Sequence, residues 1–248
     1  MSTDAASDRR VAIVLGGSGG IGRAVSERLA ADGMAVAVHY SSGARRADET
    51  VRKITDAGGV ATAVVGDVAD ESDMATLFDR TVESYGGVDV VVNTAGIMVL
   101  GPVAQFDLDD FDRMHRVNVR GTFVVTQLAA RHLRSGGALI NFSTSITRLQ
   151  TPAYAAYAAT KGAVEAMTLV TARELRGRDI TVNTIAPGPT ATPLFLAGKP
   201  QELIARIAAF SPMERIGAPE DIAAAVAELA GPARWVNGQT VFVNGGAA

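Results

Sequence analysis

The sequence predicts an α/β fold, in which one doubly wound sheet of about seven parallel strands has helices on both faces. Three observations predict it. Short β-branched runs alternate with longer helical patterns along the chain. Most of these runs are almost continuously apolar, as in parallel strands that are covered on both sides. A glycine-rich stretch directly follows the first run and opens a helical pattern.

The expected elements follow in order. The strands are Val11–Leu15, Ala35–Tyr40, Ala61–Gly66, Val88–Asn93, Ala138–Ser143, Thr181–Ile185 and Thr240–Val243. The helices are Ile21–Asp32, Arg46–Ala57, Glu71–Tyr85, Asp109–Leu133, Tyr154–Arg176 and Pro219–Ala230. Strands that alternate with helices in this way predict right-handed crossovers and one continuous sheet.

Composition narrows the function classes. The chain has 248 residues, 48% of them hydrophobic and 20% charged, which fits one globular domain over residues 1–248. A net charge of -3 gives no reason to expect binding to nucleic acid or to an anionic membrane. The chain has no cysteine, and its three histidines are far apart, so no metal site is expected and the histidines are interpreted as ordinary surface or boundary residues. A cytoplasmic location fits the lack of cysteine and of a long apolar run.

Two segments do not belong to this alternation of strands and helices. Residues 1–10 are polar and are expected to form a flexible tail. Residues 187–217 contain five prolines around a possible short helix at Gln201–Phe210. A long insertion after a strand is often a lid over a binding site, and the apolar side chains of this one favour a bulky hydrophobic substrate.

The glycine-rich stretch is the first candidate binding site. It runs from Gly16 to Gly22 and has glycines at 16, 17, 19, 20 and 22, with Ser18 and Ile21 between them. Glycines let the backbone turn tightly and approach a pyrophosphate, while the following helix offers free N–H groups. This context predicts a dinucleotide site in a Rossmann-like fold.

Tyr157 and Lys161 are the second candidate. They stand four residues apart in a helical segment, so both side chains are expected on one face of the helix. An ammonium beside a phenol favours the phenolate, so Lys161 is expected to lower the pKa of Tyr157. Such a tyrosine can exchange a proton with a carbonyl or alcohol oxygen.

With these motifs the chain resembles the short-chain dehydrogenase/reductase family, from Val11 to the C-terminus. Its glycine spacing is similar to the family's Thr-Gly-x-x-x-Gly-Ile-Gly, although Leu15 replaces the threonine whose hydroxyl braces the turn. The remaining matching positions are Asp67-Val68, Asn93-Thr94-Ala95-Gly96, Asn118, Tyr157 with Lys161, Pro187-Gly188, and the following Thr190 and Thr192.

The resemblance implies roles for these residues. Tyr157 would be the acid/base, Lys161 would tune it and hold the nicotinamide ribose, and Asn118 would support a water that supplies protons. Asp67 and Val68 would lie beside the adenine, Asn93, Ala95 and Gly96 beside the ribose, and Pro187, Gly188, Thr190 and Thr192 beside the nicotinamide.

The resemblance also implies a side-chain hydroxyl, 13 residues before Tyr157, that orients the substrate carbonyl. That position is Thr144, between Ser143 and Ser145, and Ser145 is the second choice. Ser145, Tyr154 and Leu194 are the expected substrate contacts.

The preferred cofactor is NADP, with NAD as the alternative. Family members that use NAD usually have an acid at the end of the second strand, and here Tyr40, Ser41 and Ser42 occupy that region. Arg45 or Arg46 is then available for the 2′-phosphate.

The predicted reaction is the NADPH-dependent reduction of a ketone or 3-oxoacyl group to a secondary alcohol. The alternatives are an NAD-dependent secondary-alcohol dehydrogenase and a catalytically silent cofactor-binding protein. If the substrate is bound to an acidic carrier protein, a basic patch is expected beside the pocket, with Arg131, Arg134, Arg176 and Arg178 as candidates. The resemblance also implies a homotetramer, joined through the two long helices and the last strand.

Overall fold

A computed structural model of the chain describes residues 9–248. One parallel sheet of seven strands runs through it in the order β3-β2-β1-β4-β5-β6-β7. The fold class predicted from the sequence is confirmed. The strands are β1 (Val11–Leu15), β2 (Ala35–Tyr40), β3 (Val60–Val65), β4 (Val88–Asn93), β5 (Leu133–Phe142), β6 (Thr181–Pro187) and β7 (Thr240–Val243).

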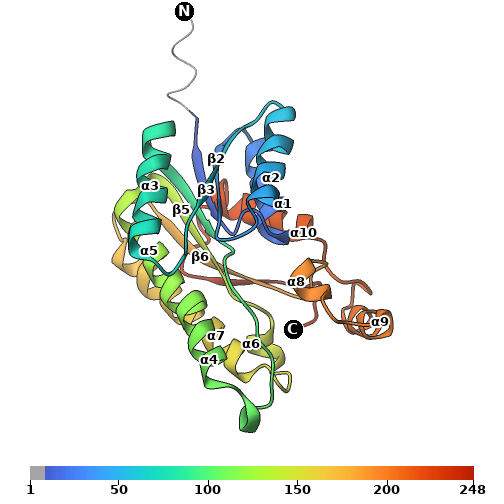
Figure 1. Ribbon diagram of the computed structural model, residues 1–248. Coiled ribbons are helices and arrows are strands. Elements are labelled where there is room, and N and C mark those ends of the chain that lie inside the picture. The colour runs from blue at the N-terminus through green and yellow to red at the C-terminus, as the bar shows by residue number, and fades with distance from the viewer. Residues whose placement is uncertain (1–8) are drawn as a thin grey trace, which may run out of the picture.

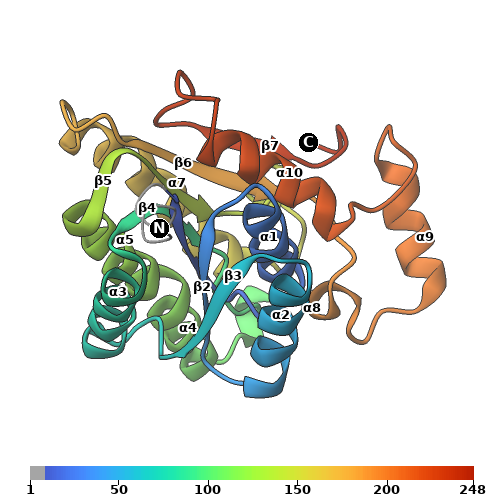
Figure 2. The ribbon, with the colours of Figure 1, turned by 90° about the horizontal axis from the view of Figure 1, so that it is seen from above.

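Helices cover both faces of the sheet (Figures 1 and 2). One face packs against α1 (Gly20–Ala31), α2 (Ala44–Asp56) and α10 (Pro219–Ala230), and the other against α3 (Glu71–Tyr85), α5 (Gly121–His132) and α7 (Ala155–Glu174). Alternate residues of β1 serve the two cores, Val14 on the α1 side and Ile13 on the α3 side. Burial on both faces explains why the strands are apolar without a break.

The strand order reverses between β1 and β4, the neighbours from which the sheet extends in opposite directions. In such sheets the loops at the carboxyl ends of the two strands diverge and leave a crevice. The glycine-rich stretch follows β1 and the Asn93–Gly96 stretch follows β4, so both predicted cofactor segments lie at this point.

The predicted helix Asp109–Leu133 is interrupted. It consists of α4 (Leu108–Met114), a π-helical turn η2 (His115–Arg120) and α5, and Leu133 already belongs to β5. The carboxylate of Asp107 begins α4 by accepting bonds from the N–H groups of Asp109 and Asp110, at 2.8 and 3.1 Å. A π-helical turn shifts the helix register, and it is here that Asn118 is placed.

The insertion after β6 is a loop whose two ends lie side by side. Thr190 and Gly217 form an isolated parallel bridge, and Gly217 N–H donates to Pro189 O at 2.8 Å, so the segment leaves and returns at one place. Between them lie α8 (Pro193–Leu196) and α9 (Gln201–Phe210), of which α9 projects from the body of the molecule (Figure 2). The short helix expected at Gln201–Phe210 is α9, whereas α8 and two further short helices, η1 (Val103–Gln105) and α6 (Ile146–Leu149), were not predicted.

Of the predicted tail, residues 1–10, residues 1–8 lie outside the residues that the structure describes. Arg10 is anchored, because its guanidinium donates to Ala230 O at 2.7 Å and more weakly to Gly136 O at 3.4 Å. The next residue, Val11, donates its N–H to the Asp89 carboxylate at 2.7 Å. Within residues 9–248 no helix has the length and apolar character needed to cross a membrane.

Candidate active site

The glycine-rich stretch forms a tight turn between β1 and α1. Gly16 has φ +71°, a conformation that strains any residue with a Cβ. A Cβ on Gly22 would lie 2.2 Å from Gly16 O, so the turn closes on itself only if residue 22 is glycine. The first turn of α1 contains no acidic residue, and its N–H groups face the crevice as a cradle for an anion.

Two residues for which the sequence predicted no role at this turn stabilise it. Thr94 donates its hydroxyl to Leu15 O at 2.7 Å, which supplies from β4 the hydroxyl that position 15 lacks. His39 is buried, not a surface residue, and its Nδ1 accepts the N–H of Gly16 at 3.2 Å. The proton is therefore on Nε2, which donates to Gly66 O at 2.9 Å, and burial lowers the pKa of His39 so that the ring stays neutral.

A cleft runs from this turn along the carboxyl ends of the strands, and we call it the dinucleotide cleft. Most of the predicted cofactor residues line it, namely Gly16, Ser18, Gly19, Gly20, Ile21, Gly22, Tyr40, Ser41, Ser42, Asp67, Val68, Ala95, Gly96 and Thr192. Asn93 does not, because its side chain is buried beneath the cleft, where Nδ2 donates to Thr122 Oγ1 at 3.1 Å.

The two adjacent arginines of α2 point in different directions. Arg45, one of the two predicted phosphate ligands, is exposed and forms an ion pair with Glu49 at 3.6 Å, and it does not line the cleft. Arg46 lines the cleft in its place and donates to Ser42 O at 3.5 Å. Of the two arginines left open by the sequence, the structure brings Arg46 to the site.

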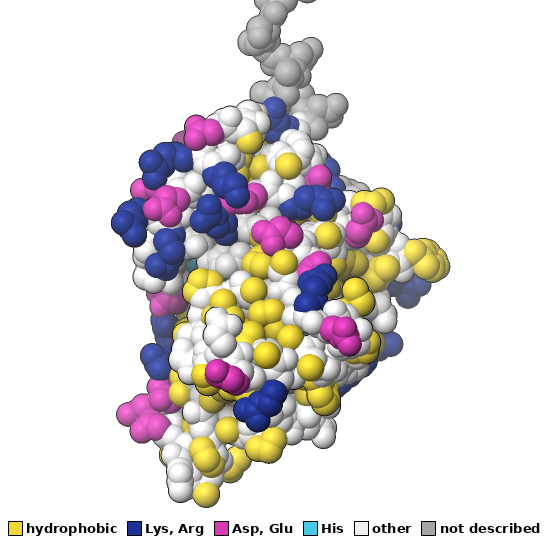
Figure 3. Space-filling model, turned by 90° about the vertical axis from the view of Figure 1, so that its right-hand side faces the viewer, with side chains coloured by type: hydrophobic (Ala, Val, Ile, Leu, Met, Phe, Trp, Pro, Cys, Tyr) yellow, Lys and Arg dark blue, Asp and Glu magenta, His cyan; other side chains and the backbone are white. Residues whose placement is uncertain are grey.

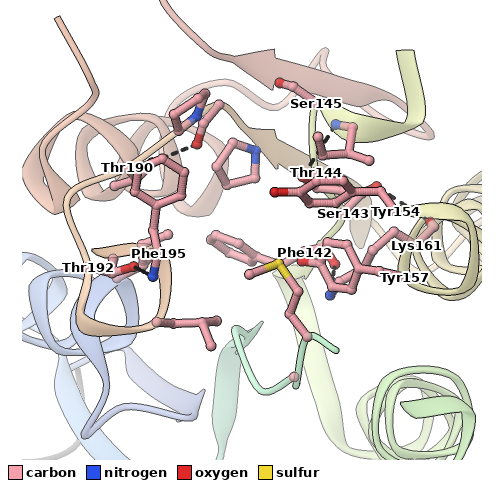
Figure 4. A pocket seen from close by; sticks show the side chains of 18 of the residues that line it. Phe142, Ser143, Thr144, Ser145, Tyr154, Tyr157, Lys161, Thr190, Thr192 and Phe195 are labelled. Atoms are coloured by element: carbon pink, nitrogen blue, oxygen red, sulfur yellow. Dashed lines mark hydrogen bonds between the residues drawn. The ribbon is translucent and has the colours of Figure 1, made fainter. Parts of the chain in front are cut away.

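Beyond Gly96 the cleft opens into a second cavity, the tyrosine pocket. Seven residues line both, namely Ile21, Thr94, Gly96, Ile97, Phe142, Thr192 and Leu194. Tyr154, Tyr157 and Lys161 enter the pocket from α7, and Thr190, Thr192 and Phe195 face them from the insertion (Figure 4). Pro187 and Gly188 also line it, at the carboxyl end of β6. A continuous path therefore leads from the glycine turn to Tyr157.

The electrostatics of Tyr157 and Lys161 differ from the expectation. Burial, with a smaller contribution from Tyr154, raises the pKa of Tyr157 to about 12, and burial lowers the pKa of Lys161 to about 8. The ammonium lies 5.8 Å from the centre of the Tyr157 ring and donates instead to Phe142 O, at 2.9 Å. The predicted lowering of the tyrosine pKa is wrong, because desolvation of the buried phenol dominates and raises it.

The three neighbouring hydroxyls have different partners. Ser143 donates to the carboxylate of Glu165, one turn beyond Lys161 on α7. Ser145 donates to Ala186 O at 3.3 Å and accepts from Asn244 at 3.2 Å. Thr144 has a single weak contact, in which its hydroxyl oxygen accepts the N–H of Ile146 at 3.4 Å. All three line the tyrosine pocket, and only the Thr144 hydroxyl proton has no acceptor among the described residues.

Asn118 is fully buried in the π-helical turn. Its amide donates to Ile97 O at 2.9 Å and to Thr160 Oγ1 at 3.1 Å, and its oxygen accepts the N–H of Ile97 at 2.9 Å. The side chain therefore connects the stretch after β4 to α7. These bonds make it a brace, and the water relay expected at this residue stays a prediction.

The four arginines predicted to form a basic patch are not beside the pocket. Arg131 lies in the last turn of α5 and Arg134 follows that helix. Arg176 and Arg178 follow the end of α7, whereas Tyr157 lies in the first turn of that helix of 20 residues. Such a helix spans roughly 30 Å. Arg134 forms an ion pair with Asp89, and Arg178 donates to Leu133 O at 2.9 Å, so both stabilise the opposite end of the sheet.

These features test whether a dinucleotide fits. The cleft has a glycine turn that excludes a Cβ, free N–H groups for a pyrophosphate, and one arginine at its far end. It ends at a tyrosine and a lysine that are suited to proton transfer. Within residues 9–248 no group of three or more metal-ligating side chains occurs. Fold and site together define an oxidoreductase of the Rossmann class that uses a dinucleotide.

The chain belongs to the short-chain dehydrogenase/reductase family and is an NAD(P)-dependent oxidoreductase that acts on CH–OH groups. The family model described as enoyl-(acyl carrier protein) reductase matches residues 16–248.

Two curated relatives and one solved structure show how close the likeness is. A short-chain type dehydrogenase/reductase of Picea abies is 42% identical over 96% of this chain and 92% of its own length. An NADPH-dependent aldehyde reductase-like protein, chloroplastic, of Arabidopsis thaliana is 40% identical over 96% of this chain and 93% of its own. The crystal structure of a short-chain dehydrogenase from Burkholderia cenocepacia in complex with NADP superposes with a TM-score of 0.90 and 38% identity, covering 96% and 97% of the two chains.

Proposed function

We propose that this protein reduces a ketone with an apolar body to a secondary alcohol, with NADPH as cofactor and Tyr157 as the proton donor. One observation supports this most strongly. Tyr157, Lys161 and the free hydroxyl of Thr144 line one pocket, at the end of a cleft that begins at the glycine turn.

NADP is supported over NAD by the far end of the cleft. The residues directly after β2, Ser41 and Ser42, are not acidic, so no carboxylate stands there to repel a 2′-phosphate, and Arg46 lines the cleft beside Ser42. The Burkholderia structure contains NADP, and the Arabidopsis relative is named as NADPH-dependent.

NADPH, when bound, supplies the hydride that adds to the carbonyl carbon. Tyr157 donates its phenolic proton to the carbonyl oxygen, so that the C=O double bond becomes a C–O single bond while one C–H and one O–H bond form. With a pKa raised to about 12 the phenol remains protonated at neutral pH, which is the form that reduction needs. Thr144 donates a hydrogen bond to the same oxygen and stabilises the negative charge that develops on it. Lys161, with its pKa near 8, is available to return a proton to Tyr157.

The direction of reaction and the assembly are parts of the same proposal. If the reaction runs in the opposite direction with NAD, the same residues make the protein a secondary-alcohol dehydrogenase, which is the alternative function. A homotetramer is supported by hydrophobic side chains exposed on two long helices, Phe123 on α5 and Leu169 and Val170 on α7. Light scattering on the purified protein measures the oligomeric state directly.

The test is the Tyr157→Phe variant. We expect it to abolish ketone-dependent oxidation of NADPH and to leave the dissociation constant of NADPH, measured by fluorescence, within about twofold. Retained turnover would reject Tyr157 as the donor. If the unaltered protein binds NADPH but reduces none of a panel of aryl and alkyl ketones, the catalytically silent cofactor-binding reading replaces this proposal.

A further inference from the structure

A third cavity, the outer chamber, lies against the tyrosine pocket on the side of the insertion. The two share the side chains of Ile146, Leu149, Tyr154, Pro189 and Phe195. A ligand whose carbonyl reaches Tyr157 can therefore extend past Tyr154 into the outer chamber without crossing a polar wall.

The far wall of the chamber is formed by one stripe of α9. Leu203, Ile207 and Phe210 follow the helical spacing of an apolar face, and all three line the chamber. Arg206 stands within that stripe, three residues after Leu203 and four before Phe210, and it lines the chamber too. Arg206 is exposed to solvent and also lines the chamber, so its guanidinium is accessible to a ligand group that enters there.

The charges around the chamber favour an anionic ligand group. Two guanidinium groups line it, and no aspartate or glutamate side chain does. Arg215 is already occupied, since it donates to both carboxylate oxygens of Asp221. Arg206 has no ion pair or hydrogen bond within residues 9–248. Figure 3 shows hydrophobic side chains gathered in the middle of one face of the molecule, with basic and acidic side chains around them.

Asn244 also lines the chamber, and its amide donates to Ser145 Oγ and to Ala248 O, each at 3.2 Å. Its donors are therefore used by the protein. Arg206 is the cation that remains for a ligand in this chamber.

Building on the proposed function, we infer that the substrate is a ketone whose apolar body spans the tyrosine pocket and the outer chamber and ends in an anionic group held by Arg206. A carboxylate and a phosphate both match a guanidinium, which binds either with two parallel hydrogen bonds. Arg206 then sets specificity at a distance from the reacting carbonyl, and a small neutral ketone leaves it unused.

The first experiment compares matched ketones. Phenyl ketones with a chain that ends in a carboxylate are measured beside their methyl esters, with chains of different length. A 3-oxoacyl pantetheine and its 4′-phosphorylated form provide the phosphate arm. We expect the anionic member of at least one pair to have a KM about tenfold lower, which corresponds to one charge-assisted contact. The pair that shows the larger effect identifies carboxylate or phosphate as the natural group.

The second experiment changes the arginine. Arg206→Gln is expected to raise the KM of the anionic ketone about tenfold and to leave the ester unchanged, and Arg206→Lys is expected to retain part of the preference. Arg80→Gln, an exposed arginine on α3, is the control and should change neither substrate. Equal effects of Arg206→Gln on ester and acid, or no preference in the unaltered protein, would overturn the inference.

A binding measurement separates this inference from the proposed function. In the Tyr157→Phe variant with NADPH bound, the dissociation constants of the acid and the ester are measured by fluorescence quenching, without turnover. A preference for the acid that Arg206→Gln removes supports the subsite even if no ketone is reduced. Neutral ketones that are reduced, together with equal binding of acid and ester, support the proposed function and reject the subsite.

Discussion

The hydroxyl of Ser143 donates to Oε1 of Glu165, and the same oxygen accepts the hydroxyl of Thr147, at 2.9 Å. One carboxylate of α7 thereby holds the segment that has Thr144 at its centre. Tyr157, Lys161 and Glu165 are spaced by four residues on one helix face, so the proton donor and the support of the Thr144 segment belong to the same rigid element.

Glu165→Ala is therefore expected to lower kcat by roughly tenfold, because a small misplacement of a donor is enough for such a loss. The dissociation constant of NADPH should not change. Glu165→Gln should remain within about threefold of the unaltered protein, since an amide oxygen can accept both hydroxyls. Steady-state kinetics with Glu174→Ala as control checks this, and an equal loss in the Gln and Ala variants would contradict it.

Thr144→Val should lower kcat by about 100-fold, the typical cost of removing one donor to a developing oxyanion. Thr144→Ser keeps the hydroxyl and is expected to stay within a few-fold. Ser145→Ala is the discriminating variant, because Ser145 already bonds to Ala186 O. A larger loss in Ser145→Ala than in Thr144→Val would move the assignment to Ser145.

Arg46→Ala should raise the KM for NADPH by roughly tenfold or more, the cost of one charge-assisted hydrogen bond, and leave the KM for NADH unchanged. Arg45→Ala is the matched control, since Arg45 is exposed and paired with Glu49. The two cofactors are compared on one ketone. If Arg45→Ala has the larger effect on NADPH, the side chains rearrange when the phosphate binds.

Lys161 links stability to pH. Its native pKa of about 8 lies below its ordinary value of 10.5, so between these values the unfolded chain binds more protons and the free energy of unfolding rises with pH. The contribution is fully present above pH 10.5 and is lost as the pH falls through 8. Over that window it amounts to about 3 kcal/mol.

Urea denaturation of the protein without cofactor measures this contribution when it is compared with Lys161→Met. Between pH 7.5 and 9.5 the unaltered protein should gain roughly 2 kcal/mol relative to the variant. The variant also loses the hydrogen bond from Lys161 to Phe142 O, and this loss changes its free energy of unfolding by the same amount at both pH values. A difference that does not change with pH would show that Lys161 titrates normally in the folded protein.

The sequence was most informative where local pattern decides the structure. The bounds of β1, β2, β4, β7, α9 and α10 agree with those expected, because apolar runs and proline or glycine mark their ends. The break at His115 could not be predicted, since the helical pattern continues through it. Asn118 in that turn is bonded to Ile97 and Thr160, residues distant in sequence.

In the site, too, local pattern predicted some features, and the tertiary structure determines the others. Motif spacing placed Tyr157, Lys161 and the glycine turn, but the direction of the tyrosine pKa shift depends on burial, which spacing does not reveal. Neighbouring helical residues point about 100° apart, so only the orientation of α2 separates Arg46 from Arg45. His39 carried one signal, its place in an apolar strand that ends beside the predicted cofactor, and this was not enough to identify its bond to Gly16.

The contact from Thr94 to Leu15 O has a consequence for how this chain is compared with its relatives. In this chain the hydroxyl that braces the turn comes from Thr94, directly after the neighbouring strand β4, and not from position 15, so a position-by-position comparison treats as separate two positions that one hydrogen bond connects. Leu15 and Thr94 therefore constitute a coupled pair: loss of the Thr94 hydroxyl would be harmful beside Leu15 and tolerable beside a threonine at that position. Relatives that differ at one of these two sites should usually differ at the other.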